Sequence, residues 1–583
     1  MDKNLKKSLA IRMAVRSATA AHRSSGCALL VIAFLLSCGS PARKADDPPV
    51  GKAGGAYDLA CRDSLQRHTA DVAEKKYLPV TLSVHQWPGR ADGGAPGAVR
   101  SSLTEAEFVN ALAAPATPEL RGVRTTLVLA RGGTGKSRLA EAVAAQSCSK
   151  LAVFRVDLNT DIAAHIEAMP PGQNPIAVHL ARTLNLDAAA GAEAALNKEL
   201  AGQTWLVMLD SLDEVPLQQR TMIASAIDDL IIRVAPTSRA VVMTRPPVFT
   251  SNYGLKTVDG RLEIPQLNCD QTEDAIDRLV ADPAERKNFQ GFVTRYGINR
   301  RVSSPERCYY PHMSTYRDLD VVQRLARNAS FDQNTPDFKD FHNSRAQVYT
   351  YFLTAQLIKD LQGVAILPAE ALATIDRLIT AKKPGGGQRN LAISVQDCVA
   401  VAPGEDAGAK QVICERLLQS SLFHGESGAY HFANQSLGDL FLARWTSASL
   451  VEDGKVDCTL IALRAELLES NEVAGFLVGQ KNGQLCLAEI STELCKRGGF
   501  AEHIFEQLDQ GLPAGADRTQ AVENASKSVG ADSPNLCVSN LLDKLNRNNP
   551  VPAAVELPAV PTPTAPPAAD ATKPAKGAKS KKK

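Results

Sequence analysis

The chain has 583 residues, of which 44% are hydrophobic and 22% are charged, so it is long enough for about two to four globular domains with substantial cores. Its 65 Lys and Arg residues nearly cancel its 63 Asp and Glu residues, and the net charge is +2. No overall field therefore favours nucleic acid or acidic substrates, and we predict no specific nucleic-acid partner.

The N-terminus has the pattern of an export signal. Several Lys and Arg residues precede the apolar run "CALLVIAFLLSCGS", which is too short to span a bilayer as a mature helix. The run ends at Leu35-Leu36-Ser37-Cys38, which resembles a bacterial lipobox, in which the cysteine is acylated and becomes the first residue of the mature chain. We expect lipidation at Cys38. A plain signal anchor and a misplaced start codon on a cytosolic protein are the alternatives.

The cysteines leave the compartment open. Of twelve, Cys27 and Cys38 belong to the apolar run, and the other ten form no CxxC pairs and have no His partners at metal spacing, so we expect no zinc site. Ten cysteines permit disulfides in an oxidising compartment, but dispersed buried thiols in a large cytosolic protein explain them equally well.

A linker separates this N-terminus from the folded part. The stretch "GSPARKADDPPVGKAGGA" has the Pro, Gly and charge content of a solvated tether. The β-prone "YLPVTLSVHQ" and the helix-like "TEAEFVNALAA" follow it. We expect the globular part to begin near Tyr57 and to include both stretches.

Apolar strands alternate with amphipathic helices between Thr125 and about Asp270. The largely uninterrupted apolar character of most of these strands predicts a parallel α/β sheet covered on both faces. The five predicted strands read "TTLVLA", "LAVFRVDL", "TWLVMLD", "RAVVMTR" and "GRLEIPQL".

A phosphate-binding loop follows the first of these strands. The stretch "ARGGTGKS" is the P-loop pattern with alanine in place of its first glycine. Glycines let backbone N–H groups turn toward phosphate oxygens, the lysine reaches the β and γ phosphates, and the serine can bind Mg²⁺. A glycine-rich turn in some other α/β protein is the alternative. The predicted nucleotide-binding residues here are Ala130, Gly132, Gly133, Thr134, Gly135, Lys136 and Ser137.

Acidic residues follow the strand of "TWLVMLDSLDEV". Asp210 ends this buried strand and is predicted to bind Mg²⁺ together with Ser137, while Glu214 is placed to orient or deprotonate an attacking water. Asp213 belongs to the same catalytic group. By itself the pattern would be an ordinary strand exit; beside a P-loop it indicates nucleotide chemistry.

The next strand, "RAVVMTRPP", ends in Thr244 and Arg245, where a sensor of the γ-phosphate would lie. Arg245 could stabilise transition-state charge, so we assign it a catalytic role. The alternative is a surface arginine that stops the strand before Pro246.

Helices dominate the rest of the chain. "CDQTEDAIDRLV" predicts a helix capped by Asp270 with Glu273 three residues later, and residues from roughly 340 to 546 show three- and four-residue apolar spacing. After Asn548 the Pro-, Ala- and Lys-rich tail lacks the apolar content to fold. The sequence leaves open whether residues from about Tyr296 to Asp340 contribute to the nucleotide pocket.

Three motifs together, "ARGGTGKS", "LDSLDEV" and "MTRPP", resemble those of the NACHT family of STAND-class signal-transduction NTPases. In that family a small residue follows the magnesium aspartate, and two acidic residues follow after one apolar position. Asp210, Ser211, Leu212, Asp213 and Glu214 match this order. The lead-in "YLPVTLSV" also resembles the segment that precedes NACHT modules.

A second likeness lies at "LLQSSLFHGESGAYHFANQSLGDLFLARW", which resembles the winged-helix segment after the NACHT core. Phe432, Ser436, Asp439 and Phe441 match the family pattern. Asn434 stands where the family has a histidine associated with the ADP-bound resting state, so this departure weakens the expectation of ADP locking. The resemblance covers roughly residues 77 to 446.

The resemblance implies a conformational switch that binds ATP, ADP and Mg²⁺, hydrolyses ATP slowly and often oligomerises when active. The predicted fold class is α/β: a P-loop NTPase parallel sheet followed by a winged-helix and mainly helical C-terminal region. We expect an unknown effector protein as partner. The predicted segments are a signal-peptide-like 1–37, a linker and lead-in 38–76, a NACHT-like domain 77–305, a helical and winged-helix-like region 306–446, an unassigned helical region 447–546 and a disordered tail 547–583.

Two other functions compete with this one. A non-catalytic lipid-anchored scaffold would retain the fold alone, although the retained Lys136, Asp210 and Glu214 argue against simple decay. A metabolic P-loop kinase would need an acceptor site that the sequence does not reveal. The expected location is the membrane, through the N-terminus; its side is unresolved, and the use of ATP favours the cytoplasmic face.

Overall fold

The computed structural model describes residues 79–86, 101–113, 124–148, 150–186, 191–201, 203–245, 254–304, 307–327, 344–364, 366–382, 391–426, 428–469, 471–496, 501–529 and 536–548, with Pro384 and parts of 65–72. The predicted signal segment, Cys38 and all but the first two residues of the predicted tail lie outside the described residues. Across the described residues, no helix is long and apolar enough to cross a membrane.

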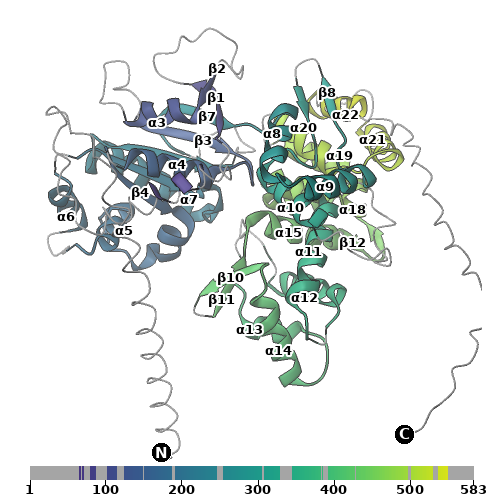
Figure 1. Cartoon of the computed structure of the whole chain (residues 1–583). Coiled ribbons are helices and arrows are strands. Elements are labelled where there is room, and N and C mark those ends of the chain that lie inside the picture. The colour runs from purple at the N-terminus through teal and green to yellow at the C-terminus, as the bar shows by residue number, and fades with distance from the viewer. Residues whose placement is uncertain are drawn as a thin grey trace, which may run out of the picture. The chain divides into compact units, whose positions relative to one another are not determined.

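A seven-stranded sheet forms the N-terminal half of the described chain, in the order β2-β1-β7-β3-β6-β5-β4 (Figure 1). Strands β7, β3, β6, β5 and β4 are parallel, which confirms the predicted parallel core, and β1 joins it antiparallel to β7 and β2. The bounds are β1 (Thr81–Gln86), β2 (Ser101–Thr104), β3 (Thr125–Ala130), β4 (Ala152–Asp157), β5 (Trp205–Asp210), β6 (Arg239–Thr244) and β7 (Val258–Ile264).

Both faces of the sheet are covered, as the apolar strands predicted. Along β3, Leu127 and Leu129 join one core while Val128 and Ala130 join the other, because successive side chains of a strand point to opposite faces. The first face packs on α5 (Pro175–Thr183), α6 (Ala192–Glu199) and α7 (Leu217–Asp229), and the second on α3 (Glu105–Ala113) and α4 (Lys136–Ser147).

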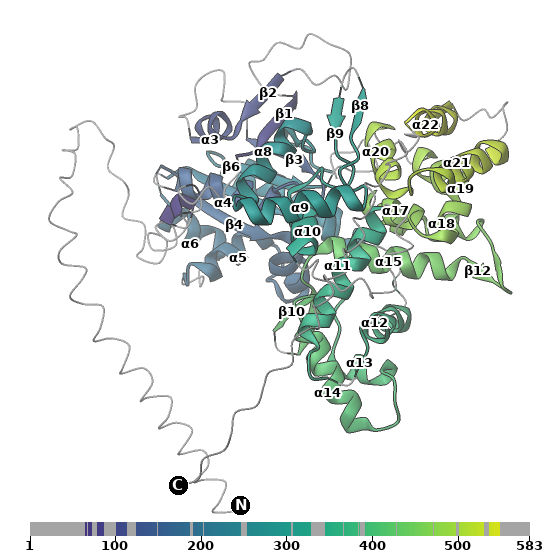
Figure 2. The same cartoon turned by 45° about the vertical axis from the view of Figure 1, so that its right-hand side comes forward.

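The remaining helices share one continuous core that runs from Leu267 to Leu545 (Figure 2). Their bounds are α8 (Cys269–Leu279), α9 (Pro283–Arg295), α10 (Tyr316–Arg327), α11 (Arg345–Asp360), α12 (Pro368–Lys382), α13 (Val395–Val401), α14 (Ala407–Leu418), α15 (Gln435–Ser449), α16 (Leu460–Leu463), α17 (Asn471–Val478), α18 (Lys481–Leu485), α19 (Leu487–Lys496), α20 (Ala501–Gly511), α21 (Ala516–Val529) and α22 (Leu536–Arg547).

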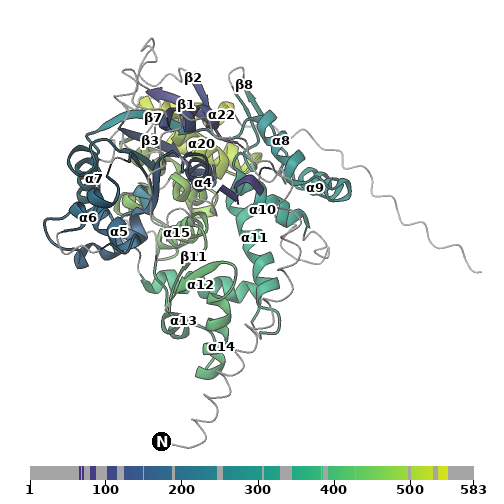
Figure 3. The same cartoon turned by 60° about the vertical axis from the view of Figure 1, so that its left-hand side comes forward.

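Short hairpins connect some of these helices. The β8 (Val302–Ser304) and β9 (Arg307–Tyr309) pair lies between α9 and α10, and β12 (Val451–Glu452) and β13 (Lys455–Val456) follow α15. The β10 (Phe423–Glu426) and β11 (Ala429–Phe432) hairpin links α14 to α15, near α12 and α13 (Figure 3). Ile393 pairs with Tyr430 and adds a backbone bridge to this hairpin.

One detail of the helical half differs from the sequence prediction, and another refines it. The N-cap of α8 is Asn268, not Asp270, and its partner in the capping box is Gln271, not Glu273, because the Asn268 side chain accepts from the Gln271 N–H. Within the region of predicted helical spacing, residues 460–478 form three separate elements, α16, a 3₁₀ turn (Ala465–Glu469) and α17.

Candidate nucleotide site

The glycine-rich loop connects β3 to α4, as predicted. Gly133 and Gly135 have φ angles of +78° and +107°, in the left-handed region that glycine adopts without steric cost. Thr134 fastens the loop internally, since its Oγ1 donates to the Arg131 carbonyl at 2.8 Å. The first turn of α4 then begins at Lys136, so the helix N-terminus and its unpaired N–H groups face the loop.

The predicted magnesium ligands lie side by side. Ser137 Oγ donates to Asp210 Oδ2 at 3.4 Å, across the intervening strand β6, so the two side chains could hold one cation together. Burial raises the pKa of Asp210, and the Lys136 ammonium partly offsets that effect. One carboxylate and one hydroxyl fit Mg²⁺, which takes its remaining ligands from phosphate and water.

A strained residue fixes the turn after Asp210. Ser211 has a φ of +66°, which is uncommon outside glycine, and its Oγ donates to Asp157 Oδ2 at the end of β4 at 3.1 Å. Its backbone N–H donates to Asp210 Oδ1 at 2.9 Å. These contacts fix the orientation of the Asp210 carboxylate and connect it to the end of β4.

The two further acidic residues have different environments. Asp213 is buried and accepts from Thr244 Oγ1 at 3.3 Å and from the Arg245 N–H at 3.0 Å, so it ties the turn after β5 to the end of β6. Burial, and then the Asp213 charge, raise the pKa of Glu214 to about 8. A carboxyl group that titrates near neutral pH can take up a proton from a water molecule. The carboxylate of Asp213 is engaged by Thr244 and Arg245.

Arg245 joins this sheet edge to the helical half. Its guanidinium is buried, with Nε 3.2 Å from Asp213 Oδ2 and Nη1 2.6 Å from Asp439 Oδ2. Glu472 Oε2 in α17 lies 3.4 Å from the same Nη1. Three carboxylates from three separate segments therefore contact Arg245, the residue predicted to lie near the γ-phosphate. Because its side chain is buried, Arg245 is not the surface arginine of the alternative interpretation.

Glu472 is a site residue that sequence reasoning missed. It accepts from Ser436 Oγ at 2.9 Å and lies 3.5 Å from Arg345 Nη2. Burial would raise its pKa, but the Arg245 and Arg345 charges outweigh that effect and hold it at about 2. A Cβ on Gly132 would lie 2.5 Å from its Oε1, so the carboxylate packs directly on the P-loop. The only sequence signal is one acid in the apolar "NEVAGFLV".

Two further contacts from the helical half reach the loop. Arg131 forms a buried ion pair with Glu506 of α20, and burial lowers the pKa of Arg131 to about 10. The Arg317 N–H at the start of α10 donates to the Gly133 carbonyl at 3.2 Å, and Tyr316 lies beside Gly135. The segment that the sequence left open thus packs on the P-loop.

The residues that resemble the winged-helix segment lie at the end of β11 and in the first turns of α15. Asn434 caps this helix, its Oδ1 accepting from the Leu437 N–H at 3.1 Å. Phe432 and Phe441 stack with centroids 5.3 Å apart. Ser436 donates to Glu472 and Asp439 accepts from Arg245, so both belong to this charged cluster.

Lys136 Nζ donates to the Ala130 carbonyl at 3.3 Å and so lies folded over the loop.

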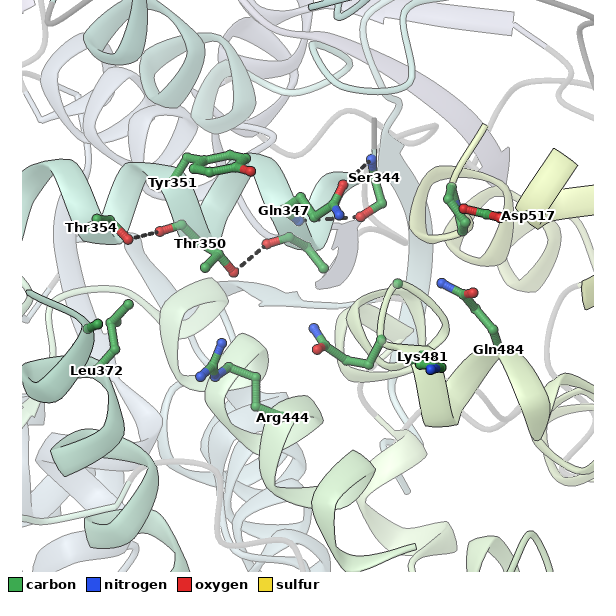
Figure 4. A pocket seen from close by; sticks show the side chains of 15 residues that line it. Ser344, Gln347, Thr350, Tyr351, Thr354, Leu372, Arg444, Lys481, Gln484 and Asp517 are labelled. Carbon is green, nitrogen blue, oxygen red and sulfur yellow. Dashed lines mark hydrogen bonds between the residues drawn. The ribbon is translucent and has the colours of Figure 1, made fainter. Parts of the chain in front are cut away.

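A separate cavity of about 610 Å³ opens among α11, α12, α15 and α18 (Figure 4). Its lining includes Thr350, Lys481 and Arg444, the last of which is paired with Asp376. None of the P-loop residues lines this cavity, so it is distinct from the nucleotide site.

No family model and no curated protein matches the chain. Among solved structures, it is similar to a Walker-type ATPase of Pyrococcus abyssi, at 12% identity over 55% of this chain and 92% of that one, with a TM-score of 0.27. The RuvB Holliday junction branch migration motor of Thermotoga maritima aligns at 12% identity over 56% and 90%, with a TM-score of 0.24. Drosophila ORC bound to DNA aligns at 14% identity over 53% and 86%, with a TM-score of 0.23.

Proposed function

We propose that the protein is a NACHT-like P-loop NTPase that binds Mg-ATP, hydrolyses it slowly and uses the bound nucleotide as a conformational switch. The observation that carries the proposal is the Arg245 cluster. One guanidinium contacts Asp213 at the sheet edge and Asp439 and Glu472 in the helical half. A group that meets the γ-phosphate on one side and the helical half on the other can report the nucleotide state.

The chain's own residues account for nucleotide binding. Backbone N–H groups of the loop and of the first turn of α4 would donate to phosphate oxygens, and Lys136 would leave the Ala130 carbonyl to reach them. Ser137 and Asp210 would hold Mg²⁺, which neutralises charge on the phosphates. Glu214 would take a proton from the attacking water.

The switch follows from charge balance. A γ-phosphate near Arg245 would compete with Asp439 and Glu472 for the same guanidinium, because all three are anions and the donors are limited. ATP would therefore weaken the contact with α15 and α17, whereas ADP would leave it in place. This is the winged-helix closure that the resemblance implies, with Glu472 added as a second acid.

Nucleotide binding tests the site directly. We expect Lys136→Ala to abolish Mg-ATP binding, measured by calorimetry on the full chain, because the substitution removes the cation that reaches the β and γ phosphates. Lys198→Ala, at an exposed lysine of α6, serves as the matched control and should bind like the unchanged protein. Equal binding by Lys136→Ala would overturn the assigned site.

The competing proposal is a lipid-anchored scaffold that keeps the fold without catalysis. The pairing of Ser137 with Asp210 and the raised pKa of Glu214 favour the NTPase, since a scaffold requires neither. Under either proposal, acylation of Cys38 would attach the chain to a membrane. Homo-oligomerisation in the ATP state and an effector protein complete the proposed switch.

A further inference from the structure

Every cysteine among the described residues is in a disulfide. Four bridges join described partners, and Cys148 is also disulfide-bonded. The Cα atoms of the bridged pairs lie 5.1 to 5.9 Å apart, within the range that a disulfide requires. The pairs are Cys269–Cys308, Cys398–Cys414, Cys458–Cys486 and Cys495–Cys537.

Dispersed buried thiols, the alternative that the sequence left open, do not account for this pattern. The pairs are 16 to 42 residues apart in sequence and connect different elements, such as α19 with α22 and the start of α8 with β9. Thiols that served only as small apolar side chains would have no reason to be paired at every described cysteine. Disulfides persist in oxidising compartments and are rare in the cytosol.

We propose that the chain folds and acts in an oxidising compartment outside the cytoplasm, with these four bridges formed. Each bridge removes two thiol protons and two electrons and creates one S–S bond. A disulfide-bearing thiol oxidase accepts the electrons by exchange and leaves as a dithiol. The proposal goes beyond the nucleotide switch and opposes the cytoplasmic location that ATP use favoured, so the nucleotide would have to reach the protein in that compartment.

The bridges also enclose the elements that cover the P-loop. The loop closed by Cys458–Cys486 contains α17 and therefore Glu472. The Cys495–Cys537 bridge connects α19 with α22, and α20, which carries Glu506, lies between them in the chain. Cys308 lies on the same connection between α9 and α10 that leads to Tyr316 and Arg317, which pack on Gly135 and Gly133. Oxidation thus constrains the helices that hold the acidic contacts on the nucleotide loop.

Peptide mapping tests the proposal on the full chain in a bacterial host. Cells are quenched in acid and alkylated before lysis, and the protein is digested without reduction. We expect peptides linked at all four pairs in a host with its periplasmic thiol oxidase, and alkylated thiols at the same positions in a host that lacks it. Free thiols in both hosts, or linked peptides in both, would overturn the proposed compartment.

The variant Cys458→Ser provides the internal control. It should leave Cys486 alkylated while the other three pairs stay linked, which shows that the reagent reaches this part of the protein. Alkylation of Cys486 in the unchanged protein would contradict the bridge. Mg-ATP binding is measured separately on the same preparation, so failure of the nucleotide proposal and failure of this one give different results.

Discussion

At the scale of single residues, the central feature is a buried arginine with more than one anionic partner. Burial alone would lower the pKa of Arg245, but the Asp439, Glu472 and Asp213 charges raise it well above its ordinary value. Removing one acid from such a cluster leaves charge without compensation, and breaking a buried pair typically costs about 3–5 kcal/mol. The ion pairs of Arg245 therefore stabilise the packing of α15 and α17 against the end of β6, and a phosphate that binds near Arg245 would compete with them.

Glu472→Gln should weaken the ion pairs that Glu472 forms with Arg245 and Arg345. We expect the free energy of unfolding to fall by roughly 3 kcal/mol, the lower end for a broken buried pair, since an amide still accepts a hydrogen bond. Release of a fluorescent ADP analogue should accelerate by about 10-fold, because the helical half is held less firmly over the loop. Glu466→Gln, at an exposed neighbour in the preceding turn, should change neither quantity.

Gly132→Ala should disturb the packing of Glu472 on the P-loop by a change in the loop itself. Gly132 does not have a positive φ, so alanine is compatible with its backbone, but the added Cβ would meet the Glu472 carboxylate at 2.5 Å. That carboxylate cannot move aside cheaply while Ser436 and two arginines hold it. Faster ADP release in both variants would assign the effect to the contact; unchanged release in both would remove Glu472 from the switch.

Glu214 makes the protein sensitive to pH. Its folded-state pKa of about 8 exceeds its ordinary value near 4.5, so the stability that it contributes is present at low pH and is lost as the pH rises through 8. Deprotonation should in turn increase ATP hydrolysis between pH 6 and 8. Glu214→Gln should lower the hydrolysis rate by about 10²-fold or more and flatten this profile, measured by phosphate release. A Gln variant with an unchanged rate would exclude Glu214 as the base.

At the scale of elements, the sequence predicted the sheet well and the contacts between the halves poorly. The predicted strand "TTLVLA" matches β3 residue for residue, because a buried parallel strand is an uninterrupted apolar run between polar ends. Asp270 was a reasonable cap, but Asn268 lies one residue before the helix and captures the free N–H group. Glu472 gave no local pattern, since its partners Arg245 and Arg345 are more than a hundred residues away.

The Cys458–Cys486 bridge should contribute to stability through the element that it closes. The two cysteines are 28 residues apart, and loop-closure entropy for such a loop is about 3–4 kcal/mol. We expect the double variant Cys458→Ser and Cys486→Ser to lose up to this amount of unfolding free energy in denaturant titration. Reduction of the unchanged protein opens the other bridges as well, so it should cost at least as much as the double variant. No loss in the double variant would refute the contribution of this bridge.

At the scale of the whole molecule, the sheet and the helices α8 to α22 have separate hydrophobic cores, and buried ion pairs connect the two parts. The sheet has one core on each face, and α8 to α22 share a third. Buried ion pairs cross between them at Arg245 with Asp439 and Glu472, and at Arg131 with Glu506. Charged contacts can exchange partners when a phosphate arrives, which an apolar interface cannot do so readily.

Hydrogen exchange of α15 and α17 in the presence of Mg-ADP or Mg-ATP tests the proposed switch most directly. We expect amide protection in these helices to fall with Mg-ATP relative to Mg-ADP, and to be unaffected by nucleotide in Lys136→Ala. Equal protection of α15 and α17 in both nucleotide states, in protein shown to bind both nucleotides, would contradict the switch.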